Sequence, residues 1–412
     1  MYSALDTSQL APDGARIAAE ALGNCVHCGF CNASCPTYLL LGNELDGPRG
    51  RIYLIKQVLE GNECSGKTLS HLDRCLSCRA CETTCPSGVA YGQLLEVGRQ
   101  AVLNKVKRPY RERLLRYLLR RILPYPRRLA AVLSLTPLLG WLWPAAVRER
   151  LKDLPELPRT RPDAIVSAPS SRQVLLLAGC AQATVRPDIN ETTIRVLERL
   201  DISARIITGS GCCGAVAQHM DAANEARRFM RQNIDAWWPA VEAGAEAILS
   251  TSSACSLMLK DYGRLLADDQ DYRDKAERVS GLCRDAAELI AAEDDDTLLK
   301  TFGRLDGRQR VAMHLPCTAQ HGQRLIPALE KIMRAVGVQL TDVEDSHICC
   351  GAAGTYTVLQ PELSTQLRRN RLQALQQGSP DTIATANIGC LLHLQNHAGV
   401  PVSHWIELLD QG

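Results

Sequence analysis

The sequence predicts a multidomain protein with an α-helical N-terminal domain followed by two tandem α/β modules whose sheets are parallel. Three observations predict this fold: the length of 412 residues, a cysteine motif repeated within the first 105 residues, and a strand-and-cysteine pattern repeated in the second half. A chain of this length exceeds one typical domain. The expected boundaries are 1–105 for the helical domain, 106–170 for a basic and apolar helical connector, 171–270 for the first module, 271–306 for a helical linker and 307–412 for the second module.

The composition excludes some classes of function. The formal net charge is only +2 and aromatic residues make up 4% of the chain, so neither a general affinity for nucleic acid nor disorder is indicated. Residues 1–24 include acids and lack a long apolar stretch, which predicts a cytoplasmic protein. In that reducing compartment, the 18 cysteines are expected to bind metal rather than form disulfides.

Two cysteine runs near the N-terminus share one spacing. Residues 25–36 read CVHCGFCNASCP and residues 75–86 read CLSCRACETTCP. Both are the C-x2-C-x2-C-x3-C-P run of bacterial two-cluster ferredoxins, which predicts two [4Fe–4S] clusters. Paired zinc sites are the alternative, but they lack the third C-x2-C step.

The fourth cysteine of each run is expected to ligate the other cluster, because it begins the turn that faces the neighbouring motif. The candidate ligands of the first cluster are therefore Cys25, Cys28, Cys31 and Cys85, and those of the second are Cys35, Cys75, Cys78 and Cys81. His27 lies between two ligands, and we interpret it as a bystander since four thiolates per cluster are already present.

The segment between the two runs, residues 47–61, is apolar at helical spacing after Gly47 and Pro48, which predicts a helix beside the clusters. Arg49 and Arg51 near its start either offset the negative charge of the clusters or form an ordinary solvated pair. We do not count them as site residues.

The connector combines positive charge with apolar residues. Residues 105–128 contain ten basic residues and one acid, with arginines on one helical face, a pattern typical of a membrane-surface helix or a docking helix. Residues 129–147 carry no charge over 19 positions, but Pro137, Gly140 and Pro144 argue against a membrane span. Peripheral contact with the cytoplasmic face of the inner membrane and a helical hairpin packed on the protein itself both remain open.

The second half repeats itself. Strands are expected at 174–178, 202–207 and 246–251, and again at 309–313, 338–343 and 381–386, each leading toward cysteine. The interval from the first cysteine to the paired cysteines is 32 residues in both repeats. The candidate cluster ligands or redox thiols are Cys180, Cys212, Cys213 and Cys255 in the first module, and Cys317, Cys349, Cys350 and Cys390 in the second.

Alternation of strand and helix predicts parallel sheets, with these cysteines beyond the carboxyl ends of the strands. Helix N-termini at that edge favour thiolates, which indicates metal or redox chemistry. Residues 209–214 also fit a dinucleotide-binding glycine pattern, but the second repeat keeps its cysteines and loses two of the three glycines. Cys64 and Cys283 fit neither pattern and receive no role.

These tandem modules resemble the cysteine-rich CCG domains of heterodisulfide reductases and related iron–sulfur oxidoreductases. With the ferredoxin-like domain and stretches such as ELDGPRGRIYLIKQVLEGNE and LTDVEDSHICCG, the whole chain resembles the family of glycolate oxidase iron–sulfur subunits. The resemblance implies a hetero-oligomer in which FAD-containing subunits oxidise glycolate to glyoxylate. This chain, without catalytic residues of its own, would carry the electrons toward a quinone-type acceptor.

The modules depart from the related pattern at one position. Heterodisulfide reductase modules end in C-x-x-C, whereas Ser252 and Asn387 replace the first cysteine here, so additional clusters in the modules stay an open prediction. Two other functions are also open. The chain could serve another flavin-dependent 2-hydroxy acid or glycerol 3-phosphate dehydrogenase, or act as a non-catalytic iron–sulfur sensor or scaffold.

Overall fold

The computed structural model describes residues 5–6, 10, 12–138, 157, 170–305 and 309–411. Its chain divides into two compact units, and we describe each by itself. The first unit comprises residues 1–117, 320–322 and 345–373, and the second comprises 118–319, 323–344 and 374–412.

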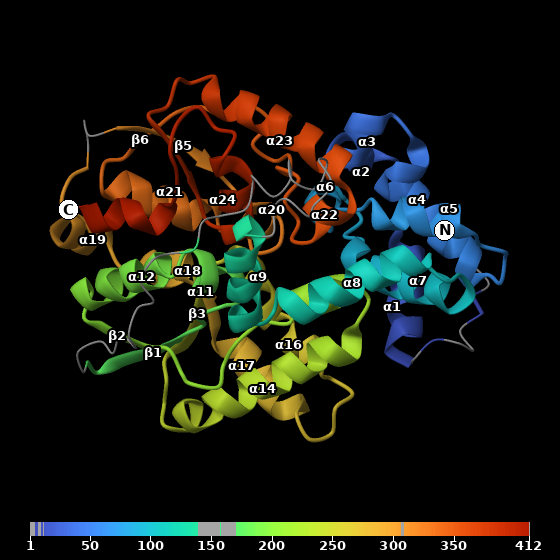
Figure 1. The fold of residues 1–412 in the computed structure, drawn as a ribbon, viewed down its shortest axis with the longest axis horizontal. Helices are drawn as coiled ribbons and strands as arrows, with labels where there is room; N and C mark the ends of the chain where they lie inside the picture. The colour runs from blue at the N-terminus through green and yellow to red at the C-terminus, as the bar shows by residue number, and fades with distance from the viewer. Residues whose placement is uncertain are drawn as a thin grey trace. The chain divides into compact units, whose positions relative to one another are not determined.

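The first unit is helical and carries both ferredoxin motifs (Figure 1). Its core includes Leu22, Leu72 and Leu94, none of which is exposed to solvent. The helices of this unit are α1 (Pro12–Asn24), α2 (Phe30–Ala33), α3 (Pro36–Leu41), α4 (Pro48–Leu59), α5 (Gly66–Asp73), α6 (Ala80–Thr84), α7 (Tyr91–Lys105), α22 (Tyr356–Leu359) and most of α23 (Pro361–Gln376), together with the short 3-10 helix η1 (Glu44–Asp46).

Helix α4 confirms the helix predicted between the motifs. Pro48 occupies its first turn, where a missing N–H costs nothing. The helix packs closely on α7, since a Cβ on Gly98 would lie 2.5 Å from Cγ1 of Ile55. A glycine is therefore required at this crossing, and it brings the backbones of the two helices together behind the cysteine motifs.

The second unit contains two four-stranded parallel sheets, as predicted, with strand orders β2-β1-β3-β4 and β6-β5-β7-β8. In the first sheet Val174 pairs with Ala247, and in the second Val311 pairs with Thr382. The strands are β1 (Arg172–Leu176), β2 (Ile202–Arg205), β3 (Ala247–Ser250), β4 (Cys283–Asp285), β5 (Arg310–His314), β6 (Gln339–Leu340), β7 (Thr382–Thr385) and β8 (Val402–His404).

Helices cover both sheets and close two cores. One core joins the two sheets through residues such as Leu176, Met333 and Trp405, and the other lies under α14 around Trp237. The helices of this unit are α11 (Ala181–Val185), α12 (Asp188–Arg199), α13 (Ala215–His219), α14 (Ala223–Glu242), α15 (Ser253–Lys260), α16 (Tyr262–Leu265), α17 (Arg273–Leu282), α18 (Ala286–Ile290), α19 (Asp295–Phe302), α20 (Cys317–Gln320), α21 (Ile326–Ala335), α24 (Ile388–Gln395) and η3 (Trp405–Gln411).

Two strands differ from the sequence-based expectation. β4 lies in residues 271–306, which we expected to be a helical linker, and β8 was not predicted. Each is only three residues long, too short for the two-residue alternation that reveals a strand in sequence. Each extends the edge of its sheet beyond the predicted three strands.

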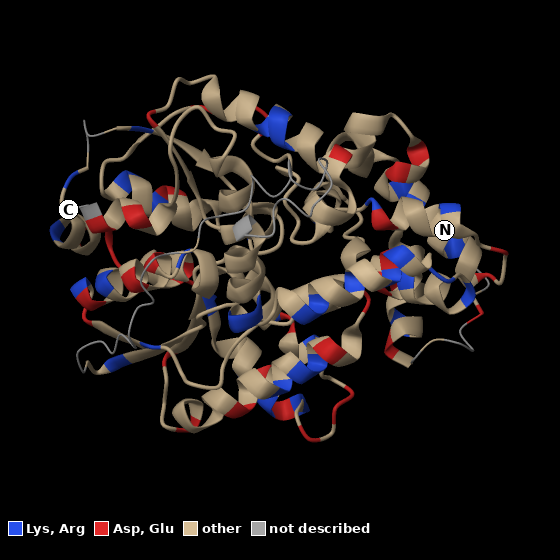
Figure 2. Cartoon of the chain, in the orientation of Figure 1, with Lys and Arg blue, Asp and Glu red and all other residues tan. Residues whose placement is uncertain are grey.

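The connector contains α8 (Tyr110–Ile122) and α9 (Pro126–Leu138), and residues 139–147 of the apolar run lie outside the described residues. Within the described part of the chain, no helix is both long and apolar enough to cross a membrane. Basic residues recur along α8 (Figure 2). Arg116 faces inward and is 7% exposed, whereas Leu114 is 43% exposed, so this helix turns apolar groups outward.

His404 at the end of β8 makes the second unit sensitive to acid. Its Nε2 lies 2.9 Å from the carbonyl oxygen of Thr251, and burial lowers its pKa to about 4 from an ordinary 6.5. The folded state therefore binds fewer protons, and the stabilisation present above pH 6.5 is lost as the pH falls toward 4.

A His404→Gln variant, whose amide can still donate to Thr251, tests this linkage. We expect the difference in unfolding free energy between the wild type and the variant to shrink by about 2 kcal/mol from pH 7 to pH 5. Denaturant titrations of both proteins at the two pH values measure it. A difference that stays constant with pH would show that His404 does not titrate in this way.

Candidate iron–sulfur centres

The first ferredoxin motif and the last cysteine of the second motif line one cavity. Cys25, Cys28 and Cys31 surround it together with Cys85. Val26 and Phe30 beside it are 69% and 63% exposed, so this centre lies near the surface. The structure thus brings together the four residues predicted to hold the first cluster.

The second cavity is lined by Cys75 and Cys78 from the second motif and by Cys35 from the first. Cys81 lines both cavities, which therefore adjoin. The placement of Cys35 and Cys85 matches the exchanged fourth ligands expected from the spacing. Four thiols around a compact space are the donor set that an iron–sulfur cubane requires, so the residues present fit this cofactor.

Two residues of each motif adopt the left-handed conformation that wraps the loop around its centre. In the first motif φ is +59° at His27 and +90° at Gly29, and in the second it is +53° at Ser77 and +60° at Arg79. A side chain at Gly29 would be strained by this φ and would displace the Arg49 guanidinium, because its Cβ would lie 2.5 Å from Nη1 of Arg49. Nε2 of His27 lies 3.3 Å from the carbonyl oxygen of Arg49, outside the thiol set.

Burial favours the protonated form of several of these thiols when no cation balances them. It raises the pKa of Cys31 to about 11, with help from neighbouring thiols, and raises that of Cys81 still more strongly. A bound metal reverses this preference, because its charge stabilises thiolates. Cluster assembly must therefore displace protons from these sites.

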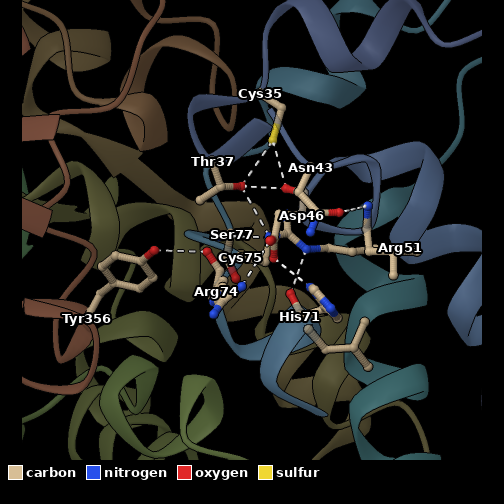
Figure 3. Close-up of polar contacts among 12 residues, drawn as sticks. Cys35, Thr37, Asn43, Asp46, Arg51, His71, Arg74, Cys75, Ser77 and Tyr356 are labelled. Carbon is tan, nitrogen blue, oxygen red and sulfur yellow. Dashed lines mark hydrogen bonds and ion pairs between the residues drawn. The ribbon is translucent and has the colours of Figure 1, made fainter. Parts of the chain in front are cut away.

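Polar groups approach the sulfur atoms of the second centre (Figure 3). The backbone N–H of Ser77 donates to Sγ of Cys75 at 3.4 Å. The hydroxyl of Tyr91 donates to the same sulfur at 3.7 Å. Sγ of Cys35 lies 3.3 Å from Oγ1 of Thr37. Hydrogen bonds to the sulfurs are one of the protein's means of raising the reduction potential of a cluster.

A buried ionic network stands behind that centre, and sequence reasoning missed it. Arg51 is 1% exposed; its Nε donates to the carbonyl oxygen of His71 at 2.8 Å and its Nη2 donates to Thr37 at 3.1 Å. Asp46, also 1% exposed, lies 3.8 Å from Arg51, 2.9 Å from His71 and 3.0 Å from Arg74. Arg51 is therefore a buried charge, whereas Arg49 is partly exposed and pairs with Glu44.

The network extends to α22. The hydroxyl of Tyr356 donates to the carbonyl oxygen of Arg74 at 2.9 Å, next to Cys75 (Figure 3). Burial, together with the nearby Cys75 thiol, raises the pKa of Tyr356, so this phenol keeps its proton. It fixes the backbone at the start of the second motif.

The cysteines of the first CCG module gather at the ends of its strands. Cys180 follows β1 as the N-cap of α11, Cys212 and Cys213 follow β2, and Cys255 lies in the first turn of α15 after β3. Sγ of Cys213 is 3.3 Å from Sγ of Cys255, and contact with Cys180 raises the pKa of Cys212. The four predicted thiols therefore form one chain of contacts that can bind a soft metal.

Asn233 and Tyr262 clamp the paired cysteines, a role that the sequence did not indicate. The amide of Asn233 donates to the carbonyl oxygen of Cys212 at 2.9 Å and accepts from the N–H of Gly211 at 2.8 Å. The hydroxyl of Tyr262 donates to the carbonyl oxygen of Cys213 at 2.9 Å. These buried contacts hold the loop rigid before any metal arrives.

The second module's cysteines are divided between the units. Cys317 begins α20 and Cys390 lies in α24, both in the second unit, where His314 ends β5 within 4.8 Å of the Cys390 sulfur. Cys349 and Cys350 are buried in the first unit. His314 was missed as a site residue because the corresponding position of the first repeat is Leu177.

The paired cysteines nevertheless have the same local geometry in both repeats. The N–H of Gly214 lies 3.4 Å from Sγ of Cys212, and the N–H of Gly351 lies 3.4 Å from Sγ of Cys349. Both glycines have φ near +90°, and a Cβ on Gly351 would lie 2.8 Å from the carbonyl oxygen of Ser364. The third position of the CCG motif is therefore a glycine because a side chain there would be strained and would clash with the backbone.

Ser252 and Asn387, which replace the expected cysteines, contact each other. Oγ of Ser252 donates to the side-chain oxygen of Asn387 at 2.7 Å, and the Asn387 amide donates to Sγ of Cys390 at 3.4 Å. The N–H of Ser253 also bonds the carbonyl oxygen of Ala386 at 3.0 Å. These hydrogen bonds connect the ends of β3 and β7 at the positions where related modules have a further cysteine.

Comparisons with known proteins agree with this arrangement. Residues 21–89 match the 4Fe-4S dicluster domain, and residues 174–260 and 311–395 match the cysteine-rich domain named CCG. The chain is 49% identical to the glycolate oxidase iron-sulfur subunit of Escherichia coli K12 over 94% of its length and 93% of that protein. The chain belongs to the family of glycolate oxidase iron–sulfur subunits.

More distant relatives include further members of this family. A probable glycolate oxidase iron-sulfur subunit of Bacillus subtilis is 29% identical over 90% of the chain and 88% of that protein. Lactate utilization protein A of the same species is 24% identical over 58% of the chain and 99% of that protein. The chain is thus an electron-transfer subunit of an oxidoreductase, with two [4Fe–4S] clusters in its N-terminal domain.

Metal in the first CCG module is a separate prediction. If its four thiols bind a cluster, the intact chain contains clearly more than about eight irons, and Cys180→Ser lowers the iron content by about four. The EPR signals of the two N-terminal clusters stay unchanged. Cys283→Ser, which removes a buried thiol outside this group, is the matched control. Equal iron in both variants would show that the module carries no iron held by Cys180.

Proposed function

We propose that this chain receives electrons from an FAD-containing partner subunit that oxidises glycolate to glyoxylate, and passes them toward a quinone-type acceptor. The similarity to the Escherichia coli glycolate oxidase subunit along almost the whole chain carries this proposal. The two adjoining thiol-lined cavities support it, since closely spaced clusters suit one-electron transfer.

The experiment is anaerobic reduction of the clusters by the native flavoprotein. Tagged chain is purified with its partner subunits, and glycolate, lactate or glycerol 3-phosphate is added while EPR follows the reduced clusters. We expect glycolate to reduce them within the turnover time of the complex. Clusters that stay oxidised with every substrate would end the carrier proposal and favour the sensor or scaffold function.

Lactate is the second candidate substrate, because lactate utilization protein A resembles more than half of the chain. Rapid reduction by lactate with none by glycolate would replace the proposed substrate and leave the electron-transfer role intact. The same comparison with glycerol 3-phosphate tests whether the partner is instead a glycerol 3-phosphate dehydrogenase.

We also propose that the complex lies on the cytoplasmic face of the inner membrane, with α8 at the lipid surface. Tyr110, Leu114 and Leu118 on this helix are 75%, 43% and 44% exposed, and arginines flank them. Apolar groups flanked by positive charge suit an anionic membrane. Flotation with phosphatidylglycerol vesicles should fall several-fold in Leu114→Glu but not in Leu340→Glu, an exposed leucine on β6. Equal flotation of both variants would contradict contact through α8.

A further inference from the structure

A second kind of cavity lies in the first unit, apart from the thiol-lined ones. It measures about 410 Å³ and is open to solvent. Its walls come from α5, from the connection between α7 and α8, from the first half of α8, and from residues 358–360. This volume is within the range of small-molecule sites in proteins.

The deep wall of the cavity is built from paired charges. Asp73 binds Arg108 and lies 3.3 Å from Arg116. Glu112 lies 2.9 Å from Arg108 and 2.8 Å from Arg116. Both arginine side chains are at least nine-tenths buried, so this ionic group is a fixed and pre-organised surface.

The rim of the cavity is positive. Lys107 and Arg111 also line it, are exposed, and form no ion pair with any residue that the structure describes. Four basic residues and two acids therefore surround the space. A ligand with electron-rich oxygen atoms, or one that gains negative charge on reduction, is favoured there.

The remaining walls are apolar. Leu69 is buried, while Leu115 and Val358 at the mouth are 38% and 40% exposed. Such walls favour a flat, mostly apolar molecule with polar oxygens over a small hydrophilic anion. A cavity with apolar sides and a few convergent donors is typical of cofactor and substrate sites.

The cavity also adjoins the second iron–sulfur centre. Asp73 precedes Cys75 by two residues, and Arg99 joins them, with its Nε 3.9 Å from Asp73 and its Nη2 3.5 Å from the carbonyl oxygen of Cys75. The same guanidinium donates to the carbonyl oxygen of Leu72 at 2.8 Å. Arg99 therefore connects a residue of the cavity wall with the backbone of a predicted cluster ligand.

We propose that this cavity binds the head group of a quinone-type electron acceptor, with the arginine-rich wall holding its carbonyl oxygens. The inference rests on the proposed function, because it names the acceptor's site on this chain. Reduction of the bound quinone to quinol takes up two electrons and two protons. A cluster held by Cys35, Cys75, Cys78 and Cys81 would supply the electrons one at a time, and water at the open mouth would supply the protons.

Two matched pairs of variants test the site. Leu115→Trp fills the cavity and Arg111→Glu reverses the charge at its rim, whereas Leu39→Trp and Arg113→Glu make the same changes at exposed positions outside the lining. Binding of duroquinone to the intact, cluster-loaded chain is measured by equilibrium dialysis. Its fully substituted ring cannot alkylate thiols. A second assay follows oxidation of chemically reduced chain by duroquinone and by ferricyanide.

We expect Leu115→Trp and Arg111→Glu each to weaken duroquinone binding about tenfold or more and to slow oxidation by duroquinone in proportion. The two control variants should match the wild type, and ferricyanide should oxidise all five proteins equally. Equal binding by all five proteins, or a wild type that binds short-chain phosphatidylglycerol but no duroquinone, would overturn the proposal. Neither assay uses the flavoprotein, so failure of the partner to reduce the clusters is detected separately.

Discussion

A Cys85→Ser variant is expected to lose the cluster held by Cys25, Cys28 and Cys31, although Cys85 belongs to the other motif in sequence. The cause is geometric, since Cys85 lines the cavity of the first motif. Iron content should fall by about four per chain, with loss of one of two EPR signals. In the same way Cys35→Ser should remove the cluster beside Cys75 and Cys78.

Double variants distinguish exchanged from unexchanged ligands. With exchange, Cys28→Ser and Cys85→Ser remove the same cluster, so the double variant loses no more iron than either single variant. Cys28→Ser combined with Cys35→Ser should remove about eight irons in total. Cys64→Ser, a thiol outside both cavities, is the control. If instead Cys28→Ser with Cys85→Ser removes about eight irons and Cys28→Ser with Cys35→Ser removes about four, each motif binds its own cluster.

Replacing Arg51 by Met should lower the reduction potential of the second centre while leaving the first nearly unchanged. Arg51 is a buried positive charge whose pKa is raised in part by Cys75 and Cys35, despite the opposing effect of burial, so it stabilises negative charge on this centre. Arg51 also lines the cavity of this centre. An interaction on the order of 1–2 kcal/mol with a buried unit charge corresponds to a shift on the order of 50–100 mV for a one-electron couple.

The same substitution should destabilise the first unit by roughly 3 kcal/mol, because it leaves Asp46 buried with fewer partners. Anaerobic redox titration monitored by EPR gives both potentials, and thermal unfolding gives the stability. Arg51→Lys keeps the positive charge but loses the planar guanidinium. Compared with Arg51→Met, it should therefore recover most of the lost reduction potential but less of the lost stability. A potential unchanged in Arg51→Met would show that the guanidinium does not tune this centre.

The parts of the molecule that follow short-range rules could be predicted from the sequence. The spacing of Cys25 to Cys35 and of Cys75 to Cys85 implied the exchanged sets, and the 32-residue interval implied two similar sheets. The cysteines of the first module then met at the strand ends as the parallel topology required.

The parts that depend on tertiary burial could not be predicted. Nothing local distinguishes Arg51 from Arg49, yet one is buried beside Asp46 and the other is partly exposed. Asn233 and Tyr262 reach the paired cysteines across 21 and 49 positions of sequence. The charged cavity likewise joins α5, α8 and residues 358–360, a combination that no motif announces.

The exchanged ligand sets that we expect, with Cys35 and Cys85 crossing over, have a consequence for biosynthesis. With these ligand sets, the second cluster has its four thiols only once residue 81 has been made, and the first only once residue 85 has been made. Cys25, Cys28 and Cys31 then lack their fourth ligand until residues 32–85 have been made. If the ligands are exchanged, neither cubane can be complete before most of the second motif has been made, and we expect a chain truncated between the motifs to hold neither one.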